Sequence, residues 1–220
     1  MKKIVVLISG SGSNLQAILD ACHPDGDLSN TQVMAVISNQ QNAYGLQRAK
    51  KQGIPTHTFP HQGFNRETYD KQLMACIDDY SPDAIILAGF MRILSSTFVQ
   101  QYEGKLLNIH PSLLPKYTGL NTHQRAIDAN DTEHGATVHF VIDELDAGPS
   151  IAQIKIALKS NDTEHTLQQR LIAEEHKLYP KAISWVLNQK VIFSKNGCQW
   201  QGEYPNQLNN IIISAKKNAA

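Results

Sequence analysis

The sequence predicts an α/β fold: a doubly wound, mostly parallel, Rossmann-like sheet with antiparallel additions in the C-terminal half. Two observations support this prediction. In the first half of the chain, short continuous apolar runs alternate with segments of helical periodicity, as strands buried on both faces alternate with helices. In the second half, strand-like segments alternate polar and apolar residues, which is typical of antiparallel strands.

Strands and helices alternate regularly through the first half. The most regular helix has Tyr69, Leu73 and Ile77 spaced by four residues, and Pro82 follows it. Ser95 is a good N-cap for the next helix. The strands are predicted at residues 4–8, 33–37, 56–59, 84–88 and 106–109, and the helices at residues 14–22, 44–52, 66–80 and 95–102.

The second half is less regular. Pro180 lies inside its longest helical pattern, which Asp162 or Thr163 would cap, and is expected to kink or interrupt it. A hairpin is expected to turn at Asn196-Gly197. Helices are predicted at residues 123–130 and 163–188, strands at 137–141 and 151–158, the hairpin at 190–201, and loops at 111–122 and 143–149.

No repeat or linker divides the chain, so residues 1–220 are predicted to form a single domain. The tail from about residue 205 has no assignment, although residues 211–213 could form a short packed strand or an interface.

The composition excludes several classes of protein. Twenty Lys and Arg balance twenty Asp and Glu, so the chain lacks the basic footprint that nonspecific nucleic-acid binding requires. Its apolar runs are too short to span a membrane, and the first one ends at Ser9, which is typical of a strand and not of a signal peptide. Three widely spaced cysteines argue against a disulfide framework. We therefore expect a cytoplasmic protein with no nucleic-acid or membrane partner.

The first chemical signal is a glycine-serine loop between the first strand and the first helix. Glycines allow backbone amides to approach an anion, and a helix N-terminus favours negative charge, so Gly12, Ser13 and Asn14 are candidates for holding a phosphate. Leu15 stands where a dinucleotide fingerprint has its third glycine, and the second strand ends without an acidic residue, so a nicotinamide-dependent dehydrogenase is disfavoured. A ligand-free tight turn is the alternative.

The second signal lies at the end of the fifth strand. Asn108 and His110 are two residues apart, so their side chains point to the same face, at the edge where open parallel sheets bind ligands. An amide beside an imidazole can stabilise an oxyanion and move a proton. The alternative is a strand-end histidine with no catalytic role.

A third signal is an acidic turn at residues 143–149. A carboxylate close to an imidazole would favour its protonated form. The residues alone do not decide between Asp143, Glu144 and Asp146, and such a cluster is also common in solvated loops.

Two other chemistries are disfavoured. Ser112 follows His110 across a proline, a poor position for a nucleophile, and the chain has no Gly-x-Ser-x-Gly elbow. The nine histidines form no His-Glu-x-x-His motif, so we expect no metal.

Taken together, six segments resemble the phosphoribosylglycinamide formyltransferase family, the folate-dependent transformylases of de novo purine synthesis. The resemblance covers about residues 3–187, and the His-Pro-Ser-Leu-Leu-Pro motif at residues 110–115 is shared with other formyl-tetrahydrofolate enzymes. The segments are residues 8–18, 87–94, 106–117, 134–141, 143–149 and 175–180.

The resemblance implies a formyltransferase fold and roles for specific residues. It implies a nucleotide-phosphate half at about residues 1–105 and a folate and catalytic half at about 106–190. The implied catalytic residues are Asn108, His110 and Asp146. The implied ribonucleotide contacts are Gly12, Ser13, Asn14 and Glu175, and the implied folate contacts are Arg66, Met91, Arg92, Ile93, Leu94, Ile142, Asp143, Glu144 and Leu145.

The implied reaction transfers a formyl group from 10-formyltetrahydrofolate, as co-substrate, to the amino group of glycinamide ribonucleotide. No metal takes part, and the protein would be a monomer or a weak homodimer. On this reading, local groups including Arg66, Arg92 and a charged His110 attract the anionic substrates to a neutral chain. A 10-formyltetrahydrofolate hydrolase or another formyltransferase with the same trio is the nearest alternative, and a non-catalytic binding module is a more distant one.

Four residues depart from the family pattern without touching the trio. Ala147 stands where glycine is usual and could stiffen the folate loop, because alanine lacks glycine's freedom in φ. Ile172 occupies a position that is often polar in the substrate pocket. The other two are Ser11 and Thr118.

Overall fold

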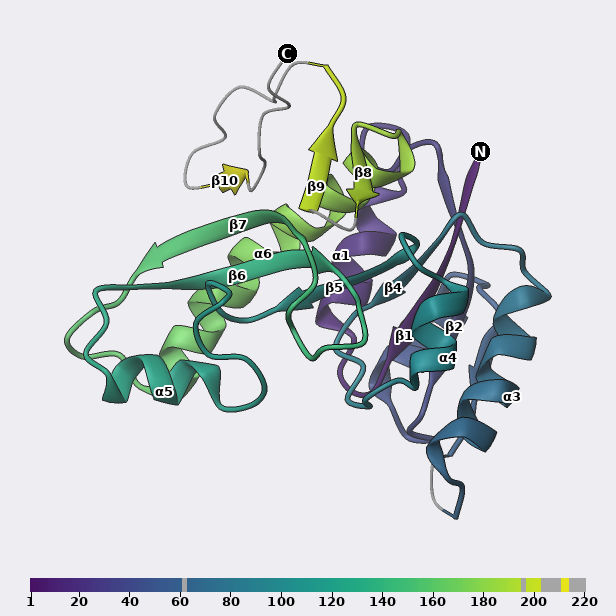
Figure 1. Cartoon of the computed structure of the whole chain (residues 1–220), viewed down its shortest axis with the longest axis horizontal. Helices are drawn as coiled ribbons and strands as arrows, with labels where there is room; N and C mark the ends of the chain where they lie inside the picture. Colours follow the sequence, from purple (N-terminus) through teal and green to yellow (C-terminus); the bar gives the residue numbers. More distant parts are fainter. Residues whose placement is uncertain (61–62, 195–196, 203–210, 214–220) are drawn as a thin grey trace. The chain divides into compact units, whose positions relative to one another are not determined.

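Two units make up the chain, Met1–Asn108 and Ile109–Ala220. The structure is a computed structural model that describes residues 1–60, 63–194, 197–202 and 211–213 (Figure 1). Strand β5 (Leu106–His110) carries the chain from the first unit into the second.

The first unit is built on a parallel sheet, as the alternating pattern predicts. Each described pairing between its strands is parallel, and the strand order is β5-β4-β1-β2-β3. The central strands are buried along most of their length, which explains their continuous apolar runs. The strands are β1 (Lys2–Ile8), β2 (Thr31–Ser38), β3 (Thr56–Thr58), β4 (Ala84–Leu87) and β5.

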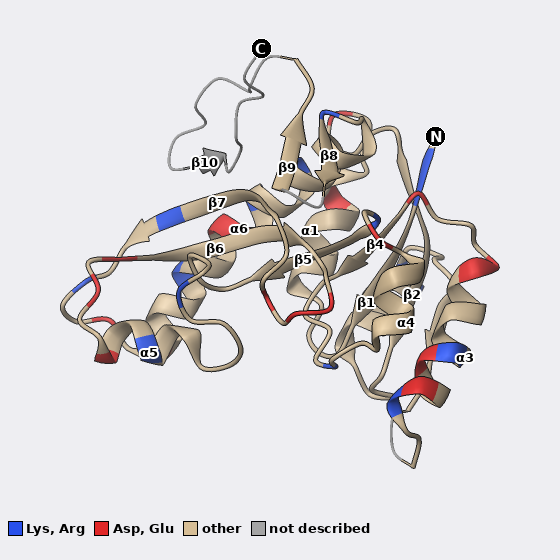
Figure 2. Cartoon of the chain, in the orientation of Figure 1, with Lys and Arg blue, Asp and Glu red and all other residues tan. Residues whose placement is uncertain are grey.

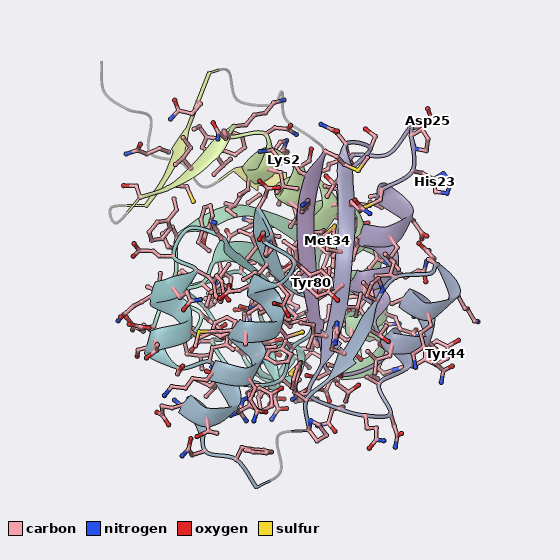
Figure 3. The ribbon with its side chains drawn as sticks, turned by 90° about the vertical axis from the view of Figure 1, so that its right-hand side faces the viewer. Lys2, His23, Asp25, Met34, Tyr44 and Tyr80 are labelled. Atoms are coloured by element: carbon pink, nitrogen blue, oxygen red, sulfur yellow. The ribbon has the colours of Figure 1, made fainter. Side chains whose placement is uncertain are left out.

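Two pairs of helices cover this sheet. Helix α1 (Ser13–Ala21) packs on α2 (Tyr44–Lys51), and α3 (Arg66–Asp78) packs on α4 (Ser96–Gln101). Figure 3 shows the strands of this unit between the two pairs, so the sheet is doubly wound. Ser95 caps α4 as predicted, because its Oγ accepts a hydrogen bond from the Phe98 amide.

The second unit contains the antiparallel strands. β6 (Glu133–Phe140) pairs with β7 (Ser150–Ala157), which also pairs with β10 (Ile211–Ile213), both antiparallel. Helix α6 (Glu164–Leu187) packs on β6 and β7 and contacts α5 (Thr122–Asp128). A separate hairpin joins β8 (Val191–Ser194) to β9 (Gly197–Trp200).

The elements of the second unit differ from the predicted ones in two places. Strand β6 begins at Glu133, earlier than the predicted residue 137, because its pairing with β7 extends back to the Glu133–Ala157 pair. Helix α6 continues through Pro180, so the proline does not interrupt it. Its partners on β6, β7 and α5 account for this, since tertiary packing can outweigh one missing amide donor. Thr163 caps it in a capping box with Thr166.

Part of the predicted hairpin turn, Asn196, lies outside the described residues, as do residues 203–210 and 214–220 of the tail. Across the part of the chain that is described, none of the helices combines the length and the apolar character needed to cross a bilayer.

Candidate active site

The carboxyl edge of the first unit's sheet is the first candidate region. The strand order reverses between β1 and β4, and their following loops, residues 9–12 and 88–95, leave from this reversal point. Open α/β sheets bind ligands at such points. Leu7, Leu87 and Asn108 lie opposite one another on β1, β4 and β5, so Asn108 reaches the same edge from the third strand.

The loop before α1 is shaped by a close backbone approach. Gly12 has a left-handed backbone (φ 70°), and a Cβ at this position would lie 2.7 Å from the Cα of Gly45 at the start of α2. The Gly45 amide donates to the Gly10 carbonyl at 3.1 Å. Gly12 also occupies the N-cap position of α1 and has no side chain to cap the helix. The first-turn amides of α1 therefore lack the side-chain acceptor that a capping residue would supply.

Arg48 on α2 donates hydrogen bonds to this loop and to helix α1. Its Nε donates to the Ser11 carbonyl at 2.9 Å and its Nη1 donates to Gln16 at 3.1 Å. Its guanidinium also lies 5.0 Å from the ring centroid of Tyr44, which is labelled in Figure 3. The loop thus carries a nearby positive charge that the sequence motif did not indicate.

Ser9 joins the two loops of this edge. Its Oγ donates to Asn39 Oδ1 at 2.6 Å and accepts from the Met91 amide at 2.7 Å, while its own amide donates to the Gly89 carbonyl. The loop after β1 and the loop after β4 are therefore held together by the same residue.

His110 and Asp146 form the second candidate region, in the second unit. Asp146 Oδ2 lies 3.5 Å from His110 Nδ1, and the two side chains are 7% and 8% exposed, respectively. The same carboxylate oxygen accepts a hydrogen bond from the Gly119 amide at 2.8 Å. On the other side of the ring, His110 Nε2 lies 2.9 Å from the Tyr117 carbonyl oxygen.

Acceptor atoms lie on both sides of the His110 ring. Both ring nitrogens of His110 face oxygen atoms that can only accept, one from an ionised carboxylate and one from a carbonyl. A neutral imidazole could donate to only one of these oxygens, whereas an imidazolium could donate to both.

His139 is a second histidine beside Asp146. Its Nε2 lies 3.9 Å from Asp146 Oδ1, and its Nδ1 lies 2.9 Å from the Phe140 carbonyl. Burial lowers the pKa of His139, which favours its neutral form. The carboxylate therefore lies between two imidazoles whose environments differ.

The structure distinguishes the three acidic residues of the loop between β6 and β7, shown in red in Figure 2. Asp143 and Glu144 are exposed, whereas the Asp146 side chain is buried against His110. A left-handed backbone at Asp146 (φ 52°) directs its side chain differently from its neighbours.

The Ser112 side chain is buried and makes hydrogen bonds that hold its loop in place. Ser112 is fully buried and its Oγ donates to the Lys116 carbonyl at 2.6 Å, while its carbonyl accepts from Thr137. The Leu114 amide donates to Thr137 as well, and Gln153 bonds both Thr137 and the Leu114 carbonyl. These hydrogen bonds connect the loop after β5 to strands β6 and β7. Ser112 therefore stabilises the position of this loop.

The remaining predicted residues are spread over both units. Arg66, Met91 and Ile93 are exposed, whereas Leu94 is buried. In the second unit, Ile142 is half-buried, Leu145 is exposed, and Glu175 is buried on α6. Ser13 and Asn14, both half-buried, open helix α1.

Arg92 has an ionic partner within its own unit. Its side chain is 15% exposed, and its Nε lies 3.8 Å from Oδ1 of Asp70. Its charge is therefore compensated inside the unit.

Comparisons with known proteins identify the family. The formyl transferase family matches residues 2–183. Phosphoribosylglycinamide formyltransferase of Escherichia coli (strain K12) is 51% identical over 201 residues, which cover 91% of this chain and 94% of the relative. This chain belongs to the phosphoribosylglycinamide formyltransferase family.

Solved structures agree with this membership. Phosphoribosylglycinamide formyltransferase from Coxiella burnetii has a TM-score of 0.85 and 48% identity, covering 90% of this chain and 93% of that one. Glycinamide ribonucleotide transformylase 1 from Symbiobacterium toebii has a TM-score of 0.86 and 36% identity, covering 92% and 95%. The predicted family and the predicted α/β fold are both confirmed.

Several groups of the two candidate regions could not be found from the sequence. Arg48 and His139 are single residues without a motif, and their contacts depend on how distant elements pack. Gly119 and Tyr117 act through backbone atoms, which carry no side-chain signal. Within the described ranges, no three His, Cys, Asp or Glu side chains gather as metal ligands would.

Proposed function

We propose that this formyltransferase moves the formyl group of 10-formyltetrahydrofolate to the amino group of glycinamide ribonucleotide. Asn108, His110 and Asp146 are the proposed catalytic residues. The names of relatives that align along nearly the whole chain support the substrate pair. The observation that carries the catalytic part is the buried contact between His110 and Asp146.

The ribonucleotide phosphate is proposed to bind at the start of α1. The uncapped first turn supplies amide donors, and the adjacent Arg48 adds positive charge. Gly12, Ser13 and Asn14 form this site, and the absence of a Cβ at Gly12 keeps the loop against α2. Glu175 is proposed as a further ribonucleotide contact.

The folate is proposed to contact Arg66, residues 91–94 and residues 142–145. The large apolar side chains of Met91, Ile93 and Leu145 are all more than half exposed, which suits contact with a flat aromatic ligand.

In the proposed mechanism, the neutral amine of the ribonucleotide attacks the formyl carbon and forms a tetrahedral oxyanion. Asn108 and the His110 imidazolium donate to this oxygen. Because His110 Nε2 already donates to the Tyr117 carbonyl, the oxyanion replaces that carbonyl as the acceptor. Asp146 stabilises the imidazolium throughout.

The intermediate then collapses. The nitrogen–carbon bond of the new amide is retained, and the bond between the formyl carbon and N10 of the folate breaks. A proton leaves the attacking amine and one is delivered to N10, through His110 or a bound water. The products are formylglycinamide ribonucleotide and tetrahydrofolate.

One assay tests this function. Purified protein is mixed with 10-formyltetrahydrofolate, with and without glycinamide ribonucleotide, and tetrahydrofolate release is followed. Release that depends on the ribonucleotide is expected. Equal release without it would instead favour the hydrolase, and no release in either mixture would contradict both functions.

A further inference from the structure

Two large apolar side chains face solvent in the loop between β4 and α4. Met91 is 70% exposed and Ile93 is 55% exposed. Between and after them, Arg92 and Leu94 point inward, with the Arg92 side chain 15% exposed and Leu94 9% exposed. The exposed side chains of Met91 and Ile93 form an apolar edge of this loop. The contacts of the inward side chains fix the position of that edge.

The inward arginine rests on helix α3. Its guanidinium carbon lies 3.9 Å from the centroid of the Tyr69 ring, within the range of a cation–π contact. Its Nε lies 3.8 Å from the carboxylate of Asp70, which is completely buried. The neighbours Tyr69 and Asp70 thus hold one cation from two sides.

Asp70 also holds the end of the loop. Its Oδ2 accepts a hydrogen bond of 2.6 Å from the amide of Ser95, the N-cap of α4. At the other end of the loop, the Met91 amide donates to Ser9. The exposed edge is therefore fixed at Met91, at Arg92 between the two apolar side chains and at Ser95 after them, and Asp70 makes two of these attachments.

A buried carboxylate is costly unless charge and hydrogen bonds compensate it. Asp70 receives both from this loop, through Arg92 and the Ser95 amide. The arrangement places a charge where an apolar residue would pack at lower cost, which is consistent with a requirement for a defined loop position.

We propose that Asp70 and Arg92 are positioning residues for formyl-folate binding, because they fix the loop that presents Met91 and Ile93. The proposal rests on the proposed function, since it takes residues 91–94 as folate contacts. Neither side chain acts on the reacting atoms. Removing their interaction weakens the binding of the folate and leaves that of the ribonucleotide unchanged.

The test compares Asp70→Asn with Asp78→Asn on the same helix. Asp78 accepts hydrogen bonds from Gln101 and Tyr102 at the end of α4, so its substitution is an equal chemical change that also weakens contacts between α3 and α4. Arg92→Met is the second test variant, since it keeps a long apolar chain over Tyr69 and leaves the Asp70–Ser95 bond in place.

For each protein, calorimetry gives the Kd for 10-formyltetrahydrofolate, and steady-state kinetics give kcat and both KM values. We expect Asp70→Asn to raise the folate Kd and KM about tenfold, with kcat and the ribonucleotide KM changed less than about twofold, and Arg92→Met to raise the folate Kd and KM by the same order. Asp78→Asn should leave the folate Kd near that of the wild type.

Other outcomes separate the two hypotheses. If the wild type binds no formyl folate, the proposed function fails. If the wild type binds it and both test variants bind equally well, or if Asp78→Asn weakens binding as much, the positioning role is wrong. If thermal unfolding shows that Asp70→Asn does not fold, Arg92→Met decides.

Discussion

His110 faces acceptors on both sides of its ring, and this makes single-residue substitutions informative. Asp146→Asn replaces a charged acceptor with a neutral amide of similar shape, and His110→Ala removes the proposed oxyanion donor. Each is expected to lower kcat about 100- to 1000-fold, because loss of one oxyanion donor costs that much in other enzymes. Steady-state kinetics measure the loss, and circular dichroism checks that the variants fold.

Ser112→Ala is the matched control for these variants. It removes a buried hydrogen bond to the Lys116 carbonyl but no group beside the His110 ring. Stability should fall by about 1 kcal/mol while kcat stays within a few-fold of the wild type. An inactive but folded Ser112→Ala would contradict the proposed roles and revive a nucleophilic serine.

Gly12→Ala tests the loop before α1. Alanine in the left-handed region costs about 1–2 kcal/mol, and its Cβ would lie 2.7 Å from the Gly45 backbone. We expect lower stability by chemical denaturation and a higher KM for glycinamide ribonucleotide. Gly10→Ala is the control, since a Cβ there meets nothing within 4 Å. Equal effects of the two substitutions would refute this account.

At this scale the sequence could predict residue types but not pairings. The acidic turn contains three carboxylates, and spacing alone could not select the one that meets His110. The left-handed backbone of Asp146 and its bond from Gly119, 27 residues earlier, make the selection. Arg92 is a second example. Its pairing with Asp70, earlier in the chain, depends on tertiary packing and leaves no signal in the sequence.

At the scale of elements, a pair of histidines joins α5 to β6. His123 Nδ1 and His134 Nε2 lie 3.0 Å apart, and both side chains are buried. Burial lowers the pKa of both histidines, and the adjacent His123 also lowers the pKa of His134, which falls to about 4. The carboxylate of Glu164 acts in the opposite direction on the pKa of His123, and that of Asp131 does so on the pKa of His134. The pair is therefore neutral at pH 7.

This pair predicts an acid-sensitive stability. The unfolded chain takes up protons near the ordinary value of 6.5, while folded His134 resists them down to about 4. Its contribution is complete above pH 6.5 and is lost as the pH falls through that window, to a total of about 3 kcal/mol. Urea titrations from pH 7 to 4 should show a shallower decline for His134→Gln. Parallel curves for both proteins would argue against the linkage.

The cap of helix α6 gives a second prediction for an element. Thr163 and Thr166 bond reciprocally in the capping box, so Thr163→Ala should lower the free energy of unfolding by about 1 kcal/mol. Denaturant unfolding measures this, and Thr166→Ala should give a loss of the same kind. No change in either would mean that the box does not stabilise the helix.

Elements were the most predictable part of the fold. Periodicity located the strands and helices of the first unit to within a few residues, because buried parallel strands and amphipathic helices leave strong patterns. Pro180 was the exception. A local rule predicted a kink or an interruption, and the interruption is wrong, because the packing of α6 on β6 and β7 maintains a continuous helix.

For the whole molecule, the zero net charge means that anionic substrates must be attracted by local features. The proposed chemistry needs only amide, imidazolium and carboxylate groups. Dialysis against a chelator is therefore expected to leave kcat unchanged, which the formyl-transfer assay can check. Loss of activity that zinc or magnesium restores would contradict the proposed mechanism. The oligomeric prediction, monomer or weak homodimer, can be measured by sedimentation.

The left-handed backbone of Asp146 has a consequence for how alanine scanning of this enzyme is interpreted. Asparagine and glycine tolerate φ near 52°, whereas alanine is strained there. Asp146→Ala would therefore combine the loss of the carboxylate with a deformation of its turn, and would overstate the contribution of the charge. The difference between the alanine and asparagine variants therefore reports the strain of the main chain together with the loss of the oxygen that accepts from the Gly119 amide, and not the effect of the charge.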